Sequence, residues 1–239
     1  MKLTKVQRQT ICNFGLLCWN IHKENLRPGF SEQIREWKKD PGLDLILLQE
    51  ARFSDQLFSI AGFPYVAAAN LRLPFSYSGV VTAANADPHA SHSHMTLAKE
   101  ARIFTPKNTL VTLYRFKNKA PLMVVNVHAI NFRSLAWYQW ELTRLSALIR
   151  GYKGAMIVAG DFNCWRKSRK KILDDFTGLL GLNYASPKNK RHVKKWFGFQ
   201  LDRIYSRGVV LKDIRALRCK ELSDHNPIIA RFEQQNSEL

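Results

Sequence analysis

Short hydrophobic segments alternate with amphipathic stretches along the whole chain, and this alternation is what most limits the possible folds. Four apolar segments are bounded by turn signals, at residues 14–20, 43–49, 122–128 and 155–160. Runs of this kind are typical of strands that are buried on both faces of a sheet. The stretch from about 62 to 117 is also mostly strand-like, with Gly, Pro and Asn between its segments. The sequence therefore predicts sheets in the middle of a layered structure.

Three helices are predicted from apolar residues that repeat at helical spacing. The three stripes are Phe30, Ile34 and Trp37; Leu135, Tyr138, Leu142, Leu145 and Ile149; and Ile172, Phe176 and Leu179. Since strands and helices both occur from end to end, we expect an α/β fold in which helices cover stacked sheets. No repeat, low-complexity tract or linker interrupts the pattern, so a single domain over residues 1–239 is predicted.

The chain is strongly basic. Its 239 residues include 37 Lys and Arg against 19 Asp and Glu, which gives a formal net charge of +18 at pH 7. Hydrophobic residues make up 46% of the total, which predicts a folded chain rather than a disordered one. An excess of positive charge this large predicts a polyanionic partner, such as nucleic acid or anionic lipid.

Cysteine usage and hydropathy point to a reducing compartment. The four cysteines, Cys12, Cys18, Cys164 and Cys219, form no CxxC pair and are too sparse for a disulfide-dependent secreted scaffold. The apolar runs are short and broken by charge, so no transmembrane segment is predicted. The basic N-terminus leads into an apolar run without a small-residue cleavage site, which favours a first strand over a signal peptide. We therefore expect a cytoplasmic protein.

Polar residues interrupt or follow the apolar segments at the predicted strand ends, where layered α/β proteins build their sites. They are Asn20, Glu50, His128, Asp161, Asn163, Asp202, Asp224 and His225. A single residue of this kind more often caps a helix or forms a turn. A whole set in order favours a functional site. Because the set is rich in oxygen, with two histidines and no thiolate, it suits Mg²⁺ or Mn²⁺ rather than structural zinc.

The motifs around these residues resemble, in the same order, the signatures of the endonuclease/exonuclease/phosphatase superfamily, which includes DNase I-like nucleases. They are Trp19-Asn20-Ile21, Leu48-Gln49-Glu50, Asn126-Val127-His128, Gly160-Asp161-Phe162-Asn163, Leu201-Asp202-Arg203-Ile204 and Ser223-Asp224-His225. The resemblance covers about residues 14–232, and the strings at 124–132 and 159–165 are most similar to the bacterial YafD-like branch. It implies a four-layer α/β/β/α sandwich of two mostly antiparallel sheets packed face to face. It also implies metal-dependent hydrolysis of a phosphate ester.

The resemblance further implies a role for each residue of the set. Glu50 would be the principal Mg²⁺ ligand, with Mn²⁺ as a possible substitute, and Asn20 and Asp224 are the further candidate ligands. His225 would activate the attacking water, while Asp202 would hold its other ring nitrogen. Histidine suits this task because its pKa lies near neutrality.

Four more residues complete the predicted site. Asp161 would orient the nucleophile or bind a second metal, and Asn163 would donate to a phosphate oxygen. His128 occupies the place of a second histidine that DNase I-like members use near the phosphate. No comparable supporting glutamate occurs in residues 71–80, so we expect His128 to be a simple phosphate donor. Asn131 either reaches the phosphate or caps the next helix.

A basic segment follows the Asp161 motif. Its ten cations are Arg166, Lys167, Arg169, Lys170, Lys171, Lys188, Lys190, Arg191, Lys194 and Lys195. They could form a solvated helix face and loop, but the helix dipole disfavours cations at a helix N-terminus. The segment must also flank the site. We therefore favour a bound polyanion, with Arg166 and Lys167 in contact with it. Trp165 and Trp196 could stack on the substrate or lie at the edge of the core, and Trp165 is included among the substrate-binding candidates.

Three functions fit these observations. The first is a Mg²⁺-dependent phosphodiesterase that acts on nucleic acid. The second is a phospholipid or phosphoinositide phosphoesterase, which needs an exposed apolar rim beside its site. The third is a non-catalytic nucleic-acid-binding module on the same fold. The segments that flank the predicted site are charged rather than apolar, and the set of catalytic residues is complete, so the first function is favoured. We expect the protein to act as a monomer on nucleic acid or another polyanionic phosphate ester.

Overall fold

Two sheets packed face to face form the centre of the computed structural model, which describes residues 12–39, 42–57, 59–86, 88–99, 106–115 and 120–234. The first sheet contains β1 (Cys12–Asn20), β2 (Leu43–Phe53), β3 (Tyr65–Leu73), β4 (Ser76–Ala84), β13 (Val210–Ala216) and β14 (Ile228–Gln234), in the order β13-β14-β1-β2-β4-β3. The second contains β5 (Pro88–Lys99), β6 (Pro106–Tyr114), β7 (Leu122–His128), β8 (Met156–Asp161), β9 (Asn183–Ala185) and β12 (Asp202–Arg207), in the order β5-β6-β7-β8-β12-β9.

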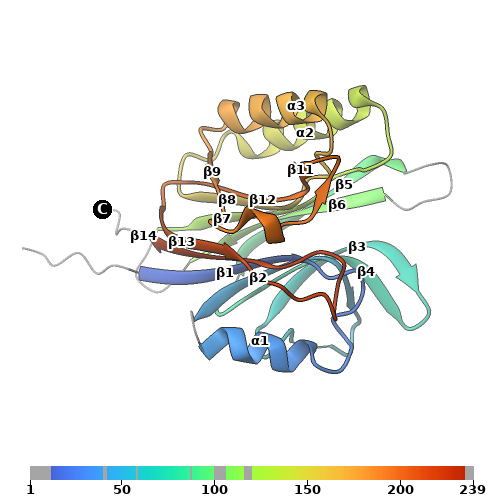
Figure 1. The fold of residues 1–239 in the computed structure, drawn as a ribbon, viewed down its shortest axis with the longest axis vertical. Coiled ribbons are helices and arrows are strands. Elements are labelled where there is room, and N and C mark those ends of the chain that lie inside the picture. The colour runs from blue at the N-terminus through green and yellow to red at the C-terminus, as the bar shows by residue number, and fades with distance from the viewer. Residues whose placement is uncertain are drawn as a thin grey trace, which may run out of the picture.

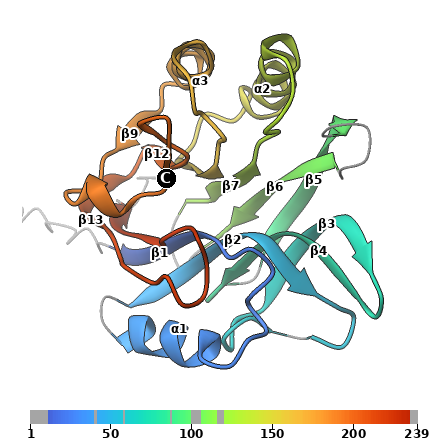
Figure 2. The same ribbon diagram turned by 45° about the vertical axis from the view of Figure 1, so that its right-hand side comes forward.

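Helices cover the outer faces of both sheets. Helix α1 (Phe30–Lys39) lies on the first sheet, and α2 (Leu135–Ile149) and α3 (Lys167–Leu179) lie side by side on the second (Figures 1 and 2). A short hairpin of β10 (Lys195–Trp196) and β11 (Phe199–Gln200) follows the 3-10 turn η1 (Lys190–His192). This arrangement confirms the predicted four-layer α/β/β/α sandwich. Within the described residues, no helix is long and apolar enough to cross a membrane.

The four predicted apolar segments are the central strands β1, β2, β7 and β8. Strands β7 and β8 are buried along their whole length, because sheet neighbours flank them and layers cover both faces. Strand β1 runs parallel to β2, and β7 runs parallel to β8, whereas the other neighbours in the two sheets are antiparallel. The sheets are therefore mostly antiparallel, as expected. Each has one central parallel pair, which brings two strand ends to the same edge.

The third helix differs from its prediction in which residues face the core. Leu173 and Phe176 are buried with Arg169, while Leu179 is 66% exposed. Arg169, Leu173 and Phe176 follow helical spacing, so the buried stripe is real but begins with a charged residue. Ile172 and Leu179 are apolar but do not belong to the buried stripe, so apolar spacing alone predicts a buried face that is rotated from the observed one.

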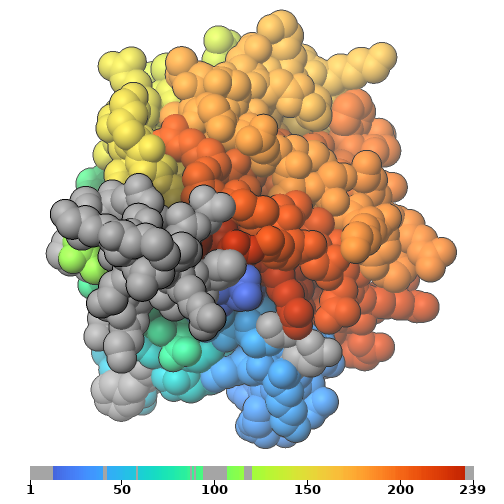
Figure 3. Space-filling model, turned by 90° about the vertical axis from the view of Figure 1, so that its left-hand side faces the viewer, coloured from blue at the N-terminus to red at the C-terminus, as the bar shows by residue number. Residues whose placement is uncertain are grey.

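The strand directions place the predicted site at one end of the sandwich. Strand β14 is antiparallel to β1, so β1 begins and β14 ends at the same end, on the left of Figure 1. Figure 3 looks onto that end, where the blue start of β1 lies beside the red end of β14. The predicted site residues lie at the opposite end of the strands, where Asn20 closes β1 and Asp161 closes β8.

Candidate active site

A cavity of about 430 Å³ opens where β1, β7 and β8 end. Eight of the predicted residues line it: Asn20, Glu50, His128, Asn131, Asp161, Asn163, Asp224 and His225. Its other lining residues are His22, Lys107, Lys194, Lys195, Trp196 and Leu201. Residues that are more than two hundred positions apart in the chain therefore share one pocket that is rich in oxygen donors and has three lysines at its wall.

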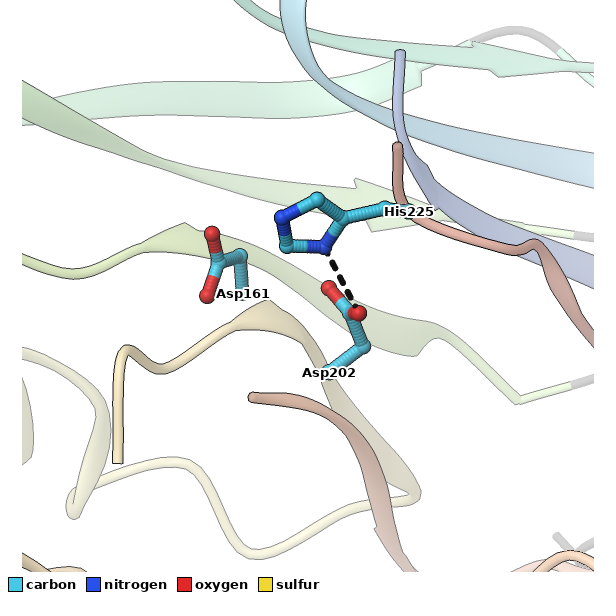
Figure 4. A group of neighbouring side chains, drawn as sticks. All are labelled: Asp161, Asp202 and His225. Carbon is cyan, nitrogen blue, oxygen red and sulfur yellow. Dashed lines mark hydrogen bonds and ion pairs between the residues drawn. The ribbon is translucent and has the colours of Figure 1, made fainter. Parts of the chain in front are cut away.

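His225 and Asp202 form a buried pair at one side of this cavity. Nδ1 of His225 lies 2.8 Å from Oδ2 of Asp202 (Figure 4). The backbone of His225 is also fixed, since its N–H donates to Ser223 Oγ at 3.1 Å and its carbonyl accepts from Trp19 Nε1 at 2.8 Å. With Nδ1 engaged by Asp202, the other ring nitrogen points towards Asp161 (Figure 4).

The charges around this imidazole favour its protonated form. Burial by itself would lower the pKa of His225, but Asp202, together with Asp161 and Asp224, raises it to about 9. A carboxylate bonded to one ring nitrogen stabilises the imidazolium that forms when the other nitrogen accepts a proton. The pair is therefore built to take up a proton on the side that faces Asp161.

Asp161 lines the cavity and is oriented from two sides. Its Oδ2 accepts from Asn20 Nδ2 at 3.1 Å, and its Oδ1 accepts from the backbone N–H of Asn163 at 3.0 Å. Asn163 has a positive φ of 46° and donates from Nδ2 to the carbonyl of Ala129 at 2.9 Å. That bond uses one amide hydrogen of Asn163, so the other hydrogen remains for the predicted phosphate contact.

A backbone irregularity turns Glu50 towards the cavity. Its φ is 51°, and the pairing of β2 with β4 shifts register between Leu48 and Ala51. Such a bulge re-aims a side chain that would otherwise follow the alternation of the strand. Oε2 of Glu50 lies 3.2 Å from Lys23 Nζ, and Oε1 lies 3.3 Å from Lys107 Nζ.

The pKa of Glu50 and the pKa of His128 are both lowered in the cavity, so Glu50 is ionised and His128 is neutral. Burial would raise the pKa of Glu50, but His128, Lys107 and Lys23 hold it well below its usual range. Burial and the charge of Lys107 lower the pKa of His128 to about 4, against the opposing effect of Glu50 and Asp161. Nε2 of His128 lies 3.6 Å from Glu50 Oε1 and 3.8 Å from Asp161 Oδ2. His128 is therefore a neutral imidazole between two carboxylates, and it can donate from one ring nitrogen.

The donor set fits a hard divalent cation. Glu50, Asn20 and Asp224 present carboxylate and amide oxygens to one cavity, which are the ligands that Mg²⁺ and Mn²⁺ prefer. Positive charge is favourable at these oxygens, since lysine ammonium groups lie 3.2 Å from Glu50 and 2.8 Å from Asp224. A second group, Asp161, Asp202 and His225, has possible ligand atoms within 4.8 Å of one another. Within that group, the hydrogen bond between Asp202 and His225 uses Nδ1 of the ring.

Arg166 and Lys167 do not belong to the described lining of the cavity, so their contact with a substrate stays a prediction. Arg166 precedes α3, and its guanidinium lies 5.1 Å from the ring of Trp165. Trp165 is half-buried and donates from Nε1 to Asn131 Oδ1 at 2.9 Å, so it positions Asn131 beside the cavity. Arg166 and Lys167 are outside the lining because the chain leaves it after Asn163 and begins α3 at Lys167.

The cations within α3 have partners of their own. Lys170 lies 2.6 Å from Asp174 and Lys171 lies 3.0 Å from Asp175, each one helical turn away. Arg169 is fully buried and donates to backbone carbonyls. These intramolecular partners explain the cations of α3 without a ligand, so α3 adds no support of its own for a bound polyanion, which stays a prediction.

The lysines that do line the cavity come from other places. Lys194 and Lys195 belong to the C-terminal part of the predicted basic segment, while Lys107 lies on β6, 57 residues from Glu50. Lys23 contacts Glu50 from the loop that follows β1. The position of Lys194 and Lys195 shortly before Leu201-Asp202 is a signal that could have identified them. No local signal marks Lys107 or Lys23, since their role depends on which segments pack together.

Comparison with known proteins agrees with the fold and the motifs. Residues 17–225 match the sequence model of the Endonuclease/Exonuclease/phosphatase family. The chain belongs to this family. It is 34% identical over 226 residues to a UPF0294 protein of Erwinia tasmaniensis, with 93% of this chain and 82% of that protein covered. A UPF0294 protein of Yersinia pestis is 34% identical over 222 residues, with 91% and 83% covered. These relatives confirm the resemblance to the YafD-like branch.

Solved structures of other family members share the fold. A family protein from Leptotrichia buccalis has a TM-score of 0.66 at 13% identity, over 92% of this chain and 99% of its own. The human Nocturnin catalytic domain, solved with a bound sulfate anion, has a TM-score of 0.62 at 16% identity, over 94% and 96%. At these identities, the likeness supports the architecture of this family member and does not extend to its substrate.

Proposed function

We propose that this member of the endonuclease/exonuclease/phosphatase family is a divalent-metal-dependent phosphodiesterase that hydrolyses a phosphate ester in nucleic acid. The observation that carries the proposal is the buried pair of His225 and Asp202, whose remaining ring nitrogen faces Asp161 in a cavity with lysines at its wall. A base, an orienting carboxylate and cationic donors around one hollow are the groups that phosphate-ester hydrolysis requires.

The substrate phosphate would be held by the donors of the cavity. Lys107, Lys194 and Lys195 supply positive charge, and Asn163 and His128 supply neutral N–H donors. Donors that are already fixed in a buried site stabilise the charge that develops on phosphoryl oxygens without further reorganisation.

Water would be activated by His225. The raised pKa of His225 would be lowered by a divalent cation bound nearby, so that the neutral ring nitrogen facing Asp161 can accept the proton of the attacking water. Asp202 then stabilises the resulting imidazolium through its bond to Nδ1. Asp161 is held by Asn20 and by the backbone of Asn163, so it can orient that water. A bound Mg²⁺ or Mn²⁺, held by Glu50, Asn20 and Asp224, would supply Lewis-acid stabilisation of the phosphoryl charge.

A hydrolysis panel tests the proposal. Plasmid, single-stranded DNA, abasic duplex, RNA, sphingomyelin and inositol phosphates would each be incubated with Mg²⁺, with Mn²⁺ and with EDTA. We expect metal-dependent cleavage of a nucleic acid, lost in Glu50→Ala and retained in Glu36→Ala. Glu36 is the matched control because it is an exposed glutamate of α1 that pairs only with its helix neighbour Lys39 among the described residues. Metal-independent cleavage, or equal loss in both variants, would contradict the proposal.

A lipid phosphoesterase is the second candidate, and one observation favours it. The expectation that only charged segments flank the site is wrong, because Phe132 and Phe197 are 58% and 73% exposed next to Trp196 of the cavity wall. Exposed aromatic rings with basic neighbours suit a membrane interface as well as a nucleic acid. Cleavage of sphingomyelin or an inositol phosphate alone would select this candidate. Binding of nucleic acid without any hydrolysis would select a non-catalytic module.

The cellular setting is part of the proposal. A cytoplasmic location is supported by Cys18, Cys164 and Cys219, which are buried free thiols. We propose that the protein acts as a monomer, since this chain by itself supplies the base, its orienting carboxylate and the candidate metal ligands. Size-exclusion chromatography with light scattering would test this, and a dimer at working concentration would refute it.

A further inference from the structure

Four aromatic side chains form a contiguous surface beside the cavity, which we call the aromatic shelf: Phe132, Trp165, Trp196 and Phe197. Trp196 is its centre, with ring centroids 5.4 Å from Phe132, 5.6 Å from Trp165 and 5.6 Å from Phe197. Trp196 also lines the cavity, so the shelf begins at the wall of the candidate active site.

The outer end of the shelf is a stack with an exposed last ring. Phe197 lies nearly parallel to Trp196, at an interplanar angle of 12°, and remains 73% exposed. Phe132 meets Trp196 edge-on at 79° and is 58% exposed. The exposed ring of Phe197 offers a flat face whose orientation is fixed by its stacking on Trp196. Such a face favours contact with a further planar group over contact with a flexible acyl chain.

The hairpin that carries Trp196 and Phe197 is held in place. Strands β10 and β11 pair Lys195 with Gln200 and Trp196 with Phe199. The N–H of Leu201 closes the hairpin by donating to the carbonyl of Lys194 at 3.0 Å. Gln200 is anchored in turn, since its Oε1 accepts from the hydroxyl of Tyr184 at 2.7 Å. A fixed platform loses little conformational entropy when a ligand binds.

The turn holds Phe197 in a backbone conformation that is unfavourable for an aromatic residue. Phe197 and Gly198 have φ values of 48° and 81°, a pair that favours Asn-Gly rather than an aromatic residue. Phe75 shows that this cost does not point to a ligand on its own, because it also has a positive φ, of 60°, and is fully exposed at the tip between β3 and β4. Phe75 is absent from the described lining of the cavity. What distinguishes Phe197 is its stack on Trp196 at the cavity wall.

We propose that the aromatic shelf stacks an unpaired base of a single-stranded nucleic acid whose scissile phosphate lies in the cavity. This inference rests on the proposed function and names the substrate class. Base stacking on aromatic side chains, next to a cationic groove, is how single strands are held without sequence readout. Lys194 and Lys195 supply the cations, since both line the cavity and directly precede Trp196. A base inside a duplex has no free face to offer, so the shelf favours single strands and frayed ends.

The test compares two phenylalanines that both have a positive φ in a hairpin turn. Phe197→Asn removes the ring and places in the turn a residue that tolerates a positive φ, so the hairpin is expected to stay folded. Phe75→Asn is the same change at a hairpin tip outside the cavity lining. Binding of a labelled oligothymidylate is measured by fluorescence anisotropy in EDTA at fixed salt. We expect Phe197→Asn to raise Kd about 5- to 150-fold, the loss of one stacked base, and Phe75→Asn to change it less than about twofold.

Two further arms make the result specific. With an oligonucleotide that lacks bases, wild type and Phe197→Asn should bind equally, because no ring is left to stack. Phe132→Leu, which keeps apolar bulk but loses the aromatic face, gives a second reading of the shelf and should also weaken oligothymidylate binding. An unchanged Kd in both Phe197→Asn and Phe132→Leu would overturn the proposal. So would equal weakening on the strand without bases.

The remaining outcome concerns lipid. If Phe197→Asn reduces sedimentation with vesicles of phosphatidylserine and phosphatidylcholine but leaves oligothymidylate binding unchanged, the shelf serves a membrane and the proposal fails. Binding in EDTA is independent of hydrolysis, so the two proposals can fail separately. Loss of the Glu50→Ala difference in the hydrolysis panel would refute the proposed function, while a base-dependent effect of Phe197→Asn would still support the shelf.

Discussion

Replacing Arg169 is the sharpest test of how the site loops are held. Its guanidinium is fully buried on α3 and donates to the carbonyls of Ile130 at 2.8 Å, Asn163 at 3.0 Å and Arg133 at 3.0 Å, and also to Asn131. These carbonyls belong to the loops that follow β7 and β8. Arg169 therefore joins the loop of Asn131 to the loop of Asn163, and we expect its loss to damage both stability and activity.

The expected size follows from these contacts. Each hydrogen bond from a charged donor contributes about 1.5–3 kcal/mol, so four of them set an upper bound of about 6–12 kcal/mol. The desolvation of a buried guanidinium offsets several kcal/mol of this sum. We therefore expect Arg169→Met to lower the free energy of unfolding by about 3–5 kcal/mol, because the backbone carbonyls that accept from the guanidinium lose their donor and each unsatisfied buried group costs about 1–3 kcal/mol. Arg169→Lys should lose about 2 kcal/mol or more, because one ammonium cannot reproduce the planar fork.

Urea denaturation followed by circular dichroism measures the effect, with activity assayed in parallel. The matched control is Lys171→Met, a cation of the same helix that is exposed and pairs with Asp175 at 3.0 Å. That variant should change the free energy of unfolding by no more than about 0.5 kcal/mol. If Arg169→Lys unfolds at the same urea concentration as wild type, the guanidinium does not hold the loops and the reasoning is refuted.

Three further predictions concern proton transfer, charge and backbone space. His225→Ala should lower the rate of hydrolysis by about 10²- to 10⁴-fold while oligonucleotide affinity is kept, and a variant that stays active would show that another group is the base. Lys195→Ala should reduce the salt dependence of oligonucleotide binding by about one counterion, whereas Lys167→Ala, outside the cavity lining, should leave the slope unchanged; the reverse pattern would place the phosphate contact at the start of α3 instead of at the cavity. Gly160→Ala should unfold the protein or destabilise it strongly in a thermal melt, because a Cβ there would lie 1.9 Å from the carbonyl oxygen of Val127 at a φ of 147°. Gly178→Ala has open space in α3 and should stabilise by up to about 1 kcal/mol, so equal melting shifts would contradict the steric argument.

Local sequence patterns predict the central strands of both sheets and two of the three helices. The apolar runs of β1, β2, β7 and β8 and the stripes of α1 and α2 are readable because burial on both faces, or on one helical face, leaves a periodic trace. The polar residues that close those runs share one cavity for two reasons. The parallel central pair of each sheet brings its strand ends together, Asn20 beside Gln49 and His128 beside Asp161, and the two sheets pack face to face. The pairing of Asp202 with His225 was implied by the family resemblance, and the structure has it at 2.8 Å.

The tertiary structure alone decided which charges serve the site and which serve the core. Within one run of basic residues, Arg169 is buried under the site loops, Lys171 is paired on the surface, and Lys195 lines the cavity. All three are cations of the same basic segment, so residue type does not separate them, and only Arg169 follows the helical spacing of buried residues. Lys107 reaches Glu50 from a strand 57 residues away. Such contacts depend on how distant segments pack in three dimensions, and a linear sequence records only the local preferences of each segment.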